Sequence, residues 1–251
     1  MIVILSPAKK MVETGDDFQP EQMPEFLEDT MRLRKALCSL SEAERKKLWN
    51  CSDALAEKAE QLLKNDPSHP HSAAVFSYSG LAYQHLSASS MDDDMLAWIR
   101  THLRILSGFY GILRPYDGVV PYRLEMQAQL ACGNAGDLYE FWNDRLYQTI
   151  KEEQIINLAS EEYSRAILPY AKKGQVITIT FLQEHHGKLV TKGSYAKMAR
   201  GDMTRWMAEQ NVSEPEELRK FDLHYSYSED LSGTEEYVFI QKQKESGKDW
   251  E

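Results

Sequence analysis

The sequence predicts an α+β fold in which helices flank a central mixed β-sheet, formed as a single domain over residues 1–251. Two kinds of segment predict this class: apolar or alternating strands at residues 2–5 and 175–182, and helical spacing at residues 24–40 and 195–210. No internal repeat or low-complexity linker divides the chain, and 42% apolar content can build a substantial core. If there were two domains, the loop at residues 65–71 would be the best boundary.

The N-terminal half begins with a short buried strand at residues 2–5, and the pattern then predicts helices. Ser41 and Glu44 have the spacing of a capping box, and Ser52 with Asp53 indicates a second helix start inside residues 41–63. Residues 73–78 have strand character, and residues 91–106 read as one helix. The acidic run at residues 92–94 suits the N-terminus of that helix better than a metal site.

The C-terminal half alternates helices with strands. The expected helices cover residues 139–152 and 195–210, and the expected strands cover residues 154–158, 175–182, 188–190 and 237–242. His185, His186 and Gly187 form the turn of a hairpin between two of these strands.

Charge and cysteine usage limit the possible functions. The net charge of −10 argues against a general nucleic-acid binder, although residues 100–126 and 188–205 carry a local basic excess that leaves a basic cleft possible. The three cysteines are widely spaced and lie in no metal-binding pattern, so we expect no structural zinc, no catalytic thiol, no metal and no cofactor. The apolar runs are too short for a signal peptide or a membrane span, which predicts a soluble, cytoplasmic protein.

Residues 106–126 are the most distinctive segment of the chain. Glycines at 108, 111 and 118 and prolines at 115 and 121 indicate a rigid, shaped loop that holds Arg114 and Arg123 in fixed directions. Fixed guanidinium groups suit phosphate or carboxylate recognition, and Glu125 could orient an arginine or carry a proton. The alternative is a packed turn whose arginines pair with acids of the same chain.

Polar residues follow two predicted strands. Ser6 and Lys9 come directly after the first strand, and Asn157 and Ser160 follow the strand at residues 154–158. Strand ends present residues to ligands in open sheets, so these four could face one crevice if the strands are neighbours. The alternatives are a solvated lysine after a turn and a helix cap at Ser160.

The helix at residues 195–210 has one apolar stripe, with Lys197 and Arg200 along its border. This row fits anion recognition. The alternative is pairing with nearby acids.

Five stretches resemble one known family in the same order: residues 4–9, 106–126, 137–144, 156–163 and 195–203. Together they resemble the YaaA family of peroxide-stress-response proteins across nearly the whole chain. The resemblance implies a cytoplasmic protein of the oxidative-stress response, a mixed fold of unusual topology, and binding of duplex DNA. Residues 106–114 also partly resemble a helix-hairpin-helix DNA-binding module, in which Gly108 and Gly111 would approach a phosphate.

The preferred function is therefore binding of duplex or distorted duplex DNA during protection against peroxide damage. The alternative is an enzyme acting on a nucleotide or nucleobase, with Lys9 or Glu125 as catalytic groups and basic side chains holding the phosphate. We expect Ser6, Lys9, Arg123, Asn157 and Arg200 to line one concavity. A deep closed pocket would favour a small molecule, and an open groove would favour DNA.

Overall fold

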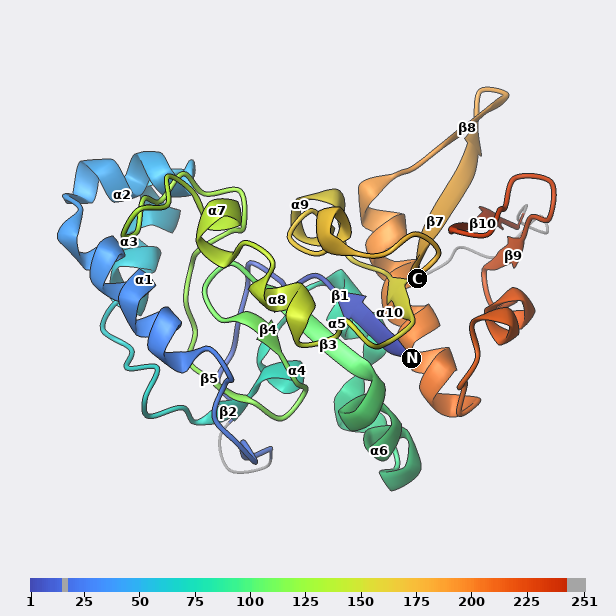
Figure 1. Cartoon of the computed structure of the whole chain (residues 1–251), viewed down its shortest axis with the longest axis horizontal. Coiled ribbons are helices and arrows are strands. Elements are labelled where there is room, and N and C mark those ends of the chain that lie inside the picture. Colours follow the sequence, from blue (N-terminus) through green and yellow to red (C-terminus); the bar gives the residue numbers. More distant parts are fainter. Residues whose placement is uncertain (15–17, 243–251) are drawn as a thin grey trace.

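A mixed β-sheet forms the centre of the computed structural model, which describes residues 1–14 and 18–242 (Figure 1). In this described part the sheet has eight strands, with β8 paired to β7 beside the order β4-β3-β1-β6-β7-β10-β9. The strands are β1 (Ile2–Leu5), β3 (Leu103–Ser107), β4 (Gly111–Leu113), β6 (Ile155–Asn157), β7 (Val176–His185), β8 (Lys188–Val190), β9 (Tyr225–Tyr227) and β10 (Glu236–Gln241).

The sheet is mixed because its middle is parallel and its margins are antiparallel. β1 lies parallel to both β3 and β6, and β7 lies parallel to β6 and β10. The pairs β3–β4, β7–β8 and β9–β10 are antiparallel. All four residues of β1 are buried, as an apolar strand covered on both faces should be. The predicted α+β class with a central mixed sheet is confirmed.

Helices cover the sheet and extend beyond one end of it, where α1 to α3 gather (Figure 1). The predicted capping box is present: Ser41 N–H donates to Glu44 Oε2 (2.8 Å), and Glu44 N–H donates to Ser41 Oγ (3.3 Å). The predicted second start at Ser52 is also present, as the N-cap of α3. The helices are α1 (Leu27–Ser39), α2 (Glu42–Trp49), α3 (Asp53–Leu62), α4 (Ala74–Ser77), α5 (Leu81–Leu86), α6 (Asp93–His102), α7 (Leu138–Trp142), α8 (Arg145–Gln148), α9 (Glu161–Ser164) and α10 (Gly193–Glu209).

Three predicted elements were wrong in type or extent. Residues 73–78 are mostly helical, because α4 covers Ala74–Ser77. Strand pairing there is limited to β2 (Ser72–Ala73) with β5 (Gly118–Val119) and to a single bridge between Tyr78 and Met11. The helix predicted to reach residue 106 ends at His102, since β3 needs the following residues for pairing with β1. The helix predicted over residues 139–152 breaks at Asn143, whose φ of 47° is left-handed.

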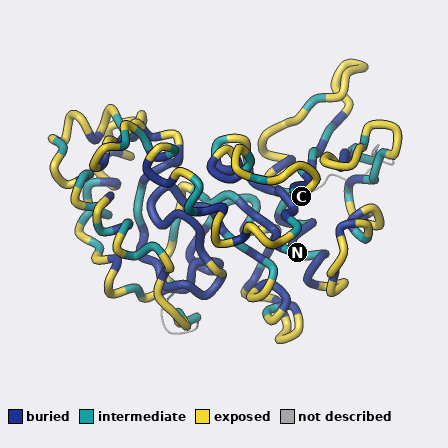
Figure 2. The backbone as a smooth tube through the Cα atoms, viewed as in Figure 1, coloured by how far each residue is buried: buried dark blue, intermediate teal, exposed yellow. Residues whose placement is uncertain are grey.

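Residues 106–114 form a β-hairpin. Ser107 pairs with Gly111 between β3 and β4, so the segment is flanked by strands and does not form a helix-hairpin-helix. Gly111 has a φ of +77°, which the turn requires and which favours glycine. The longer stretch at residues 106–126 is mostly buried (Figure 2). It therefore belongs to the core and is not a surface loop.

A close helix crossing fixes α10 against α5. A Cβ atom on Gly201 would collide with the carbonyl oxygen of Ala82, so only glycine permits this approach. The predicted apolar stripe of α10 is buried in the main hydrophobic core, through Ala196, Ala199 and Met203. The crossing therefore sets where the polar border of α10 lies.

Candidate functional site

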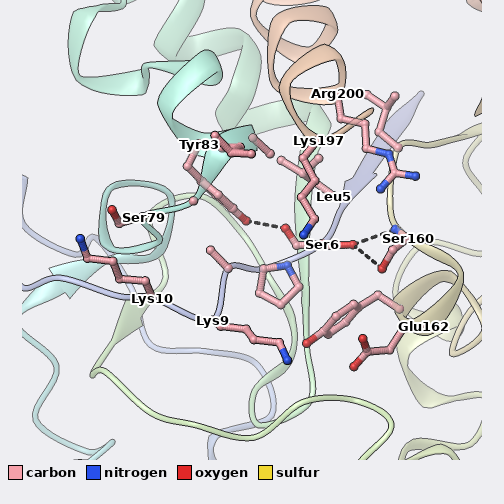
Figure 3. Close-up of a pocket in the computed structure, with 17 residues that line it drawn as sticks. Leu5, Ser6, Lys9, Lys10, Ser79, Tyr83, Ser160, Glu162, Lys197 and Arg200 are labelled. Atoms are coloured by element: carbon pink, nitrogen blue, oxygen red, sulfur yellow. Dashed lines mark hydrogen bonds between the residues drawn. The ribbon is translucent and has the colours of Figure 1, made fainter. Parts of the chain in front are cut away.

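A pocket of about 370 Å³ lies where the carboxyl ends of β1 and β6 meet α5 and α10. Its wall combines four segments that are far apart in sequence (Figure 3). The lining residues are Leu5, Ser6, Pro7, Ala8, Lys9, Lys10, Ser79, Gly80, Leu81, Ala82, Tyr83, Leu158, Ser160, Glu162, Tyr163, Lys197 and Arg200.

Parallel pairing of β1 with β6 brings the floor of the pocket together. Because Ile4 is in register with Asn157, the residues after each strand emerge side by side. Ser6 Oγ accepts a hydrogen bond from the Ser160 backbone N–H (2.8 Å) and donates to Ser160 Oγ (3.1 Å). Tyr83 O–H donates to the Ser6 carbonyl from the α5 side (2.9 Å). The two strand ends and α5 are thus fixed to one another.

Two basic side chains from α10 point into this pocket above Ser6 and Ser160 (Figure 3). Arg200 is the more enclosed, and burial lowers the pKa of its guanidinium. Its side chain has no hydrogen bond, ion pair or aromatic contact with any residue in 1–14 or 18–242, and its Nε is buried without a partner. Every other arginine of the chain has such a contact within those residues.

An ion-pair chain borders the pocket on the opposite side. Glu125 Oε1 lies 3.3 Å from Lys9 Nζ and 3.2 Å from Arg123 Nη2. The side chains of Glu125 and Arg123 are 10% and 13% exposed, whereas that of Lys9 is 65% exposed. Trp49 Nε1 donates to the Arg123 carbonyl (2.9 Å), which fixes the backbone beside the pair. Arg123 therefore reaches the site through Glu125 without lining the pocket.

Glu162 adds a second carboxylate near Lys9. Burial raises its pKa, and the Lys9 charge and the N–H of Gln127 oppose that rise. The Gln127 N–H donates to Glu162 Oε1 at 3.4 Å. A carboxylate next to a lysine at the mouth of a pocket could accept a hydrogen bond from a ligand or exchange a proton with it.

The structure gathers Ser6, Lys9, Ser160, Lys197 and Arg200 at one pocket. Asn157 lies just beneath it, buried, with Nδ2 donating to Thr178 Oγ1 (3.3 Å) and Oδ1 accepting from the Ala159 N–H (3.0 Å). Its amide thus orders the strand end that carries Ser160.

The remaining predicted residues lie elsewhere. Arg114 pairs with Glu25 (3.5 Å) and donates to Gln22 Oε1 (3.2 Å). Gly108 packs on the backbone of Glu125, and Gly111 packs on Trp142. Both glycines therefore have a packing role in the core.

Sequence reasoning missed the wall formed by residues 79–83 and the exposed Lys10. The signal available was Ser79-Gly80, a polar pair before the apolar start of α5. Gly80 is the N-cap of that helix, and a Cβ there would lie 2.9 Å from the Ala8 Cβ. Glycine therefore lets α5 approach the loop that carries Lys9 and Lys10.

Other chemistry gains no support from the described residues. Within 1–14 and 18–242, no group of three or more His, Cys, Asp and Glu side chains is placed to hold a metal ion. Cys38 is exposed, Cys51 partly buried and Cys132 buried, and burial raises the pKa of the Cys132 thiol. None of the helices in the described ranges is both long and apolar enough to cross a membrane.

Comparisons with known proteins agree on one family. A family described as "Peroxide stress protein YaaA" matches residues 1–231. A protein of Agathobacter rectalis named "UPF0246 protein" is 45% identical over 247 residues, covering 96% of this chain and 99% of its own. Relatives with that name from Lacticaseibacillus casei and Lactiplantibacillus plantarum are 44% and 45% identical, covering 96% of this chain and 100% and 99% of their own. The chain therefore belongs to the YaaA family of peroxide stress proteins.

Proposed function

We propose that this protein acts in the peroxide-stress response by binding DNA in the cytoplasm, with strand phosphates held at the pocket between β1, β6 and α10. The observation that carries the proposal is the unneutralised Arg200. A guanidinium removed from water without a carboxylate partner is costly, and a phosphate would supply both the charge and the hydrogen bonds it lacks. Lys197 and Lys10 lie at the same pocket and have no ion pair with a residue in the described ranges.

The charge of the whole chain limits the strength of this binding. At a net charge of −10, the protein repels a polyanion except where local cations dominate. Only a few basic side chains can reach phosphates at the pocket. Binding should therefore be weak at physiological salt and should strengthen steeply as salt is lowered.

The test is DNA affinity across a salt series for the wild type and the double variant Lys197→Ala, Arg200→Ala. Losing two phosphate contacts should reduce the log–log salt slope by roughly two and weaken binding to all sequences alike. The matched control is Lys172→Ala, Lys173→Ala, which removes the same charge outside the pocket. At each salt concentration, this control should bind DNA as the wild type does. Unchanged affinity in the first variant would remove α10 from the DNA interface.

A second candidate is an enzyme acting on a free nucleotide. The enclosed volume of about 370 Å³ favours it, because that size is typical of small-ligand sites. Lys9 and Glu125 would be the proton-transfer groups, with Arg200 and Lys197 holding the phosphate. Binding of nucleoside monophosphates through Arg200, with no binding of DNA at low salt, would favour this candidate over the first.

A further inference from the structure

The hairpin of β7 and β8 leaves the body of the sheet at residues 183–190, and this β7–β8 ribbon has no role in the function proposed above. β7 pairs with β6 as far as Thr178 and with β10 as far as Leu182. From Gln183 onward, its partner within the described residues is β8 alone. Figure 1 shows the ribbon standing out beyond the other strands, where β8 leads into α10. A hairpin without a third strand is marginally stable in water, so this extension adds little to the stability of the fold.

The base of the ribbon is fixed and its tip is exposed. At the base, Thr191 Oγ1 donates to the Phe181 carbonyl (3.3 Å). At the tip, residues 184–189 are all exposed (Figure 2). His186 and Gly187 have positive φ angles of 52° and 73°, which are typical of a tight two-residue turn. The turn therefore presents the side chains around it to the solvent on a defined backbone.

The two faces of the ribbon differ in charge. Residues opposite each other in a β-ladder share one face, so His185 lies with Lys188 on one face and Glu184 lies with Leu189 on the other. The ammonium group of Lys188 has no hydrogen bond or ion pair with a residue in 1–14 or 18–242. One face of the ribbon thus carries a cation, and the acid of the ribbon lies on the opposite face.

The ribbon is continuous with the basic border of α10. After β8 the chain passes Lys192, the N-cap of α10, and reaches Lys197 and Arg200 in the pocket. At about 3.3 Å per residue in a strand and about 1.5 Å per residue in a helix, the tip lies within about 30 Å of Arg200. One turn of B-DNA is about 34 Å long. A duplex of one turn is therefore long enough to contact both the pocket and the ribbon.

We propose that the β7–β8 ribbon is a DNA-binding arm, which lies in the major groove of the duplex whose phosphates are held at Lys197 and Arg200. The major groove is wide enough to admit a two-stranded ribbon. His185 and Lys188 face the DNA, and Glu184 faces away from it. This inference rests on the proposed DNA function and adds the groove and the segment through which the protein contacts the duplex.

The first experiment measures affinity for a duplex of about two helical turns across a salt series. His185→Ala, Lys188→Ala should weaken binding roughly fivefold to tenfold and reduce the log–log salt slope by roughly one, because one phosphate contact is lost. The free energy of unfolding in urea should stay unchanged, since both side chains are exposed. The matched control, His69→Ala, Lys173→Ala, removes an exposed histidine and an exposed lysine outside the ribbon and the pocket and should bind as the wild type does.

The second experiment identifies the groove with a duplex in which glucosylated 5-hydroxymethylcytosine replaces cytosine. The C5 substituent of a pyrimidine lies in the major groove, so the uncharged sugar fills that groove and leaves the phosphates unchanged. This duplex should bind the wild type more weakly than the unmodified duplex does, by about the factor lost in His185→Ala, Lys188→Ala. The double variant should bind the two duplexes equally.

The possible failures are distinguishable. If Lys197→Ala, Arg200→Ala weakens binding but His185→Ala, Lys188→Ala matches the wild type at every salt concentration, the arm is overturned and the pocket stands. Equal binding of the two duplexes by the wild type would also overturn the arm, as would an equal loss in the matched control. If the wild type binds no duplex even at low salt, both the arm and the proposed DNA function are overturned.

Discussion

Two regions of this chain carry arginines that suggest anion binding, and they differ in how the charges of those arginines are neutralised. In residues 106–126, Arg114 pairs with Glu25 and Arg123 pairs with Glu125. In the pocket, Arg200 has no acidic partner within the described ranges. An enclosed cation that the chain has already neutralised, such as Arg123, serves the fold, whereas one left without a partner marks a place for a ligand. The comparison predicts that variants in the first region change stability and that variants in the second change binding.

Gly108→Ala should give the largest effect, as a direct test of the packing role of the first region. A Cβ at this position would lie 2.6 Å from the Leu124 carbonyl oxygen and 2.9 Å from the Glu125 carbonyl carbon. Backbone atoms cannot rotate away, so we expect a loss of roughly 3 kcal/mol in the free energy of unfolding, measured in urea. Gly233→Ala is the control, since nothing lies within 4 Å of its Cβ position. Equal stability of the two variants would contradict the packing role.

Asp117→Asn tests whether a buried carboxyl of residues 106–126 makes the stability of the fold depend on pH. Burial raises the pKa of the Asp117 carboxyl from 3.8 to about 6. A raised pKa means that the folded state holds its proton more tightly, so this group favours folding below pH 4 and that contribution is lost as pH rises to about 6. At about 1.4 kcal/mol for each pH unit, the wild type should lose about 2 to 3 kcal/mol relative to Asp117→Asn between pH 4 and pH 7. Parallel stability curves for the two proteins would show that Asp117 does not titrate in this way.

Arg123→Met and Arg200→Met compare the two regions directly, because each variant replaces one arginine by an uncharged side chain. Arg123→Met leaves the enclosed Glu125 with only the exposed Lys9, so unfolding free energy should fall by about 2 kcal/mol. Arg200→Met removes a desolvated cation that has no partner in the described residues, so stability should change by less than about 1 kcal/mol or rise. Urea unfolding of both measures the difference. A loss for Arg200→Met as large as that for Arg123→Met would mean that Arg200 is structural.

Local patterns predicted most of the fold, because they depend on neighbours in sequence. The capping box at Ser41 and Glu44 and the alternating strand β7 are formed by residues close together, and both were predicted. The strand β3 was not, since Leu103–Ser107 continues the helical pattern of α6 and becomes a strand only by pairing with β1. Partners a hundred residues away override local propensity.

Part of the site was predictable because some of its residues follow local patterns in the sequence. Ser6, Lys9 and Ser160 follow apolar strands, which is a local signal, and they meet because β1 and β6 are neighbours. The separation of Arg114 from Arg200 depends on where acids such as Glu25 lie in the fold. Charge pairing over such distances cannot be read from spacing along the chain.

The central position of β1 has a consequence for how the chain acquires its structure. This strand has neighbours that follow it by about 100 and 150 residues, so one of its edges has no partner until β3 has left the ribosome and the other has none until β6 has. Closing such long loops before any parallel pairing is gained slows folding. At about 5–20 residues per second of synthesis, the second neighbour of β1 follows it by about 8 to 30 s. The middle of the sheet is therefore completed late in folding, when the apolar strand Ile2–Leu5 gains its second partner.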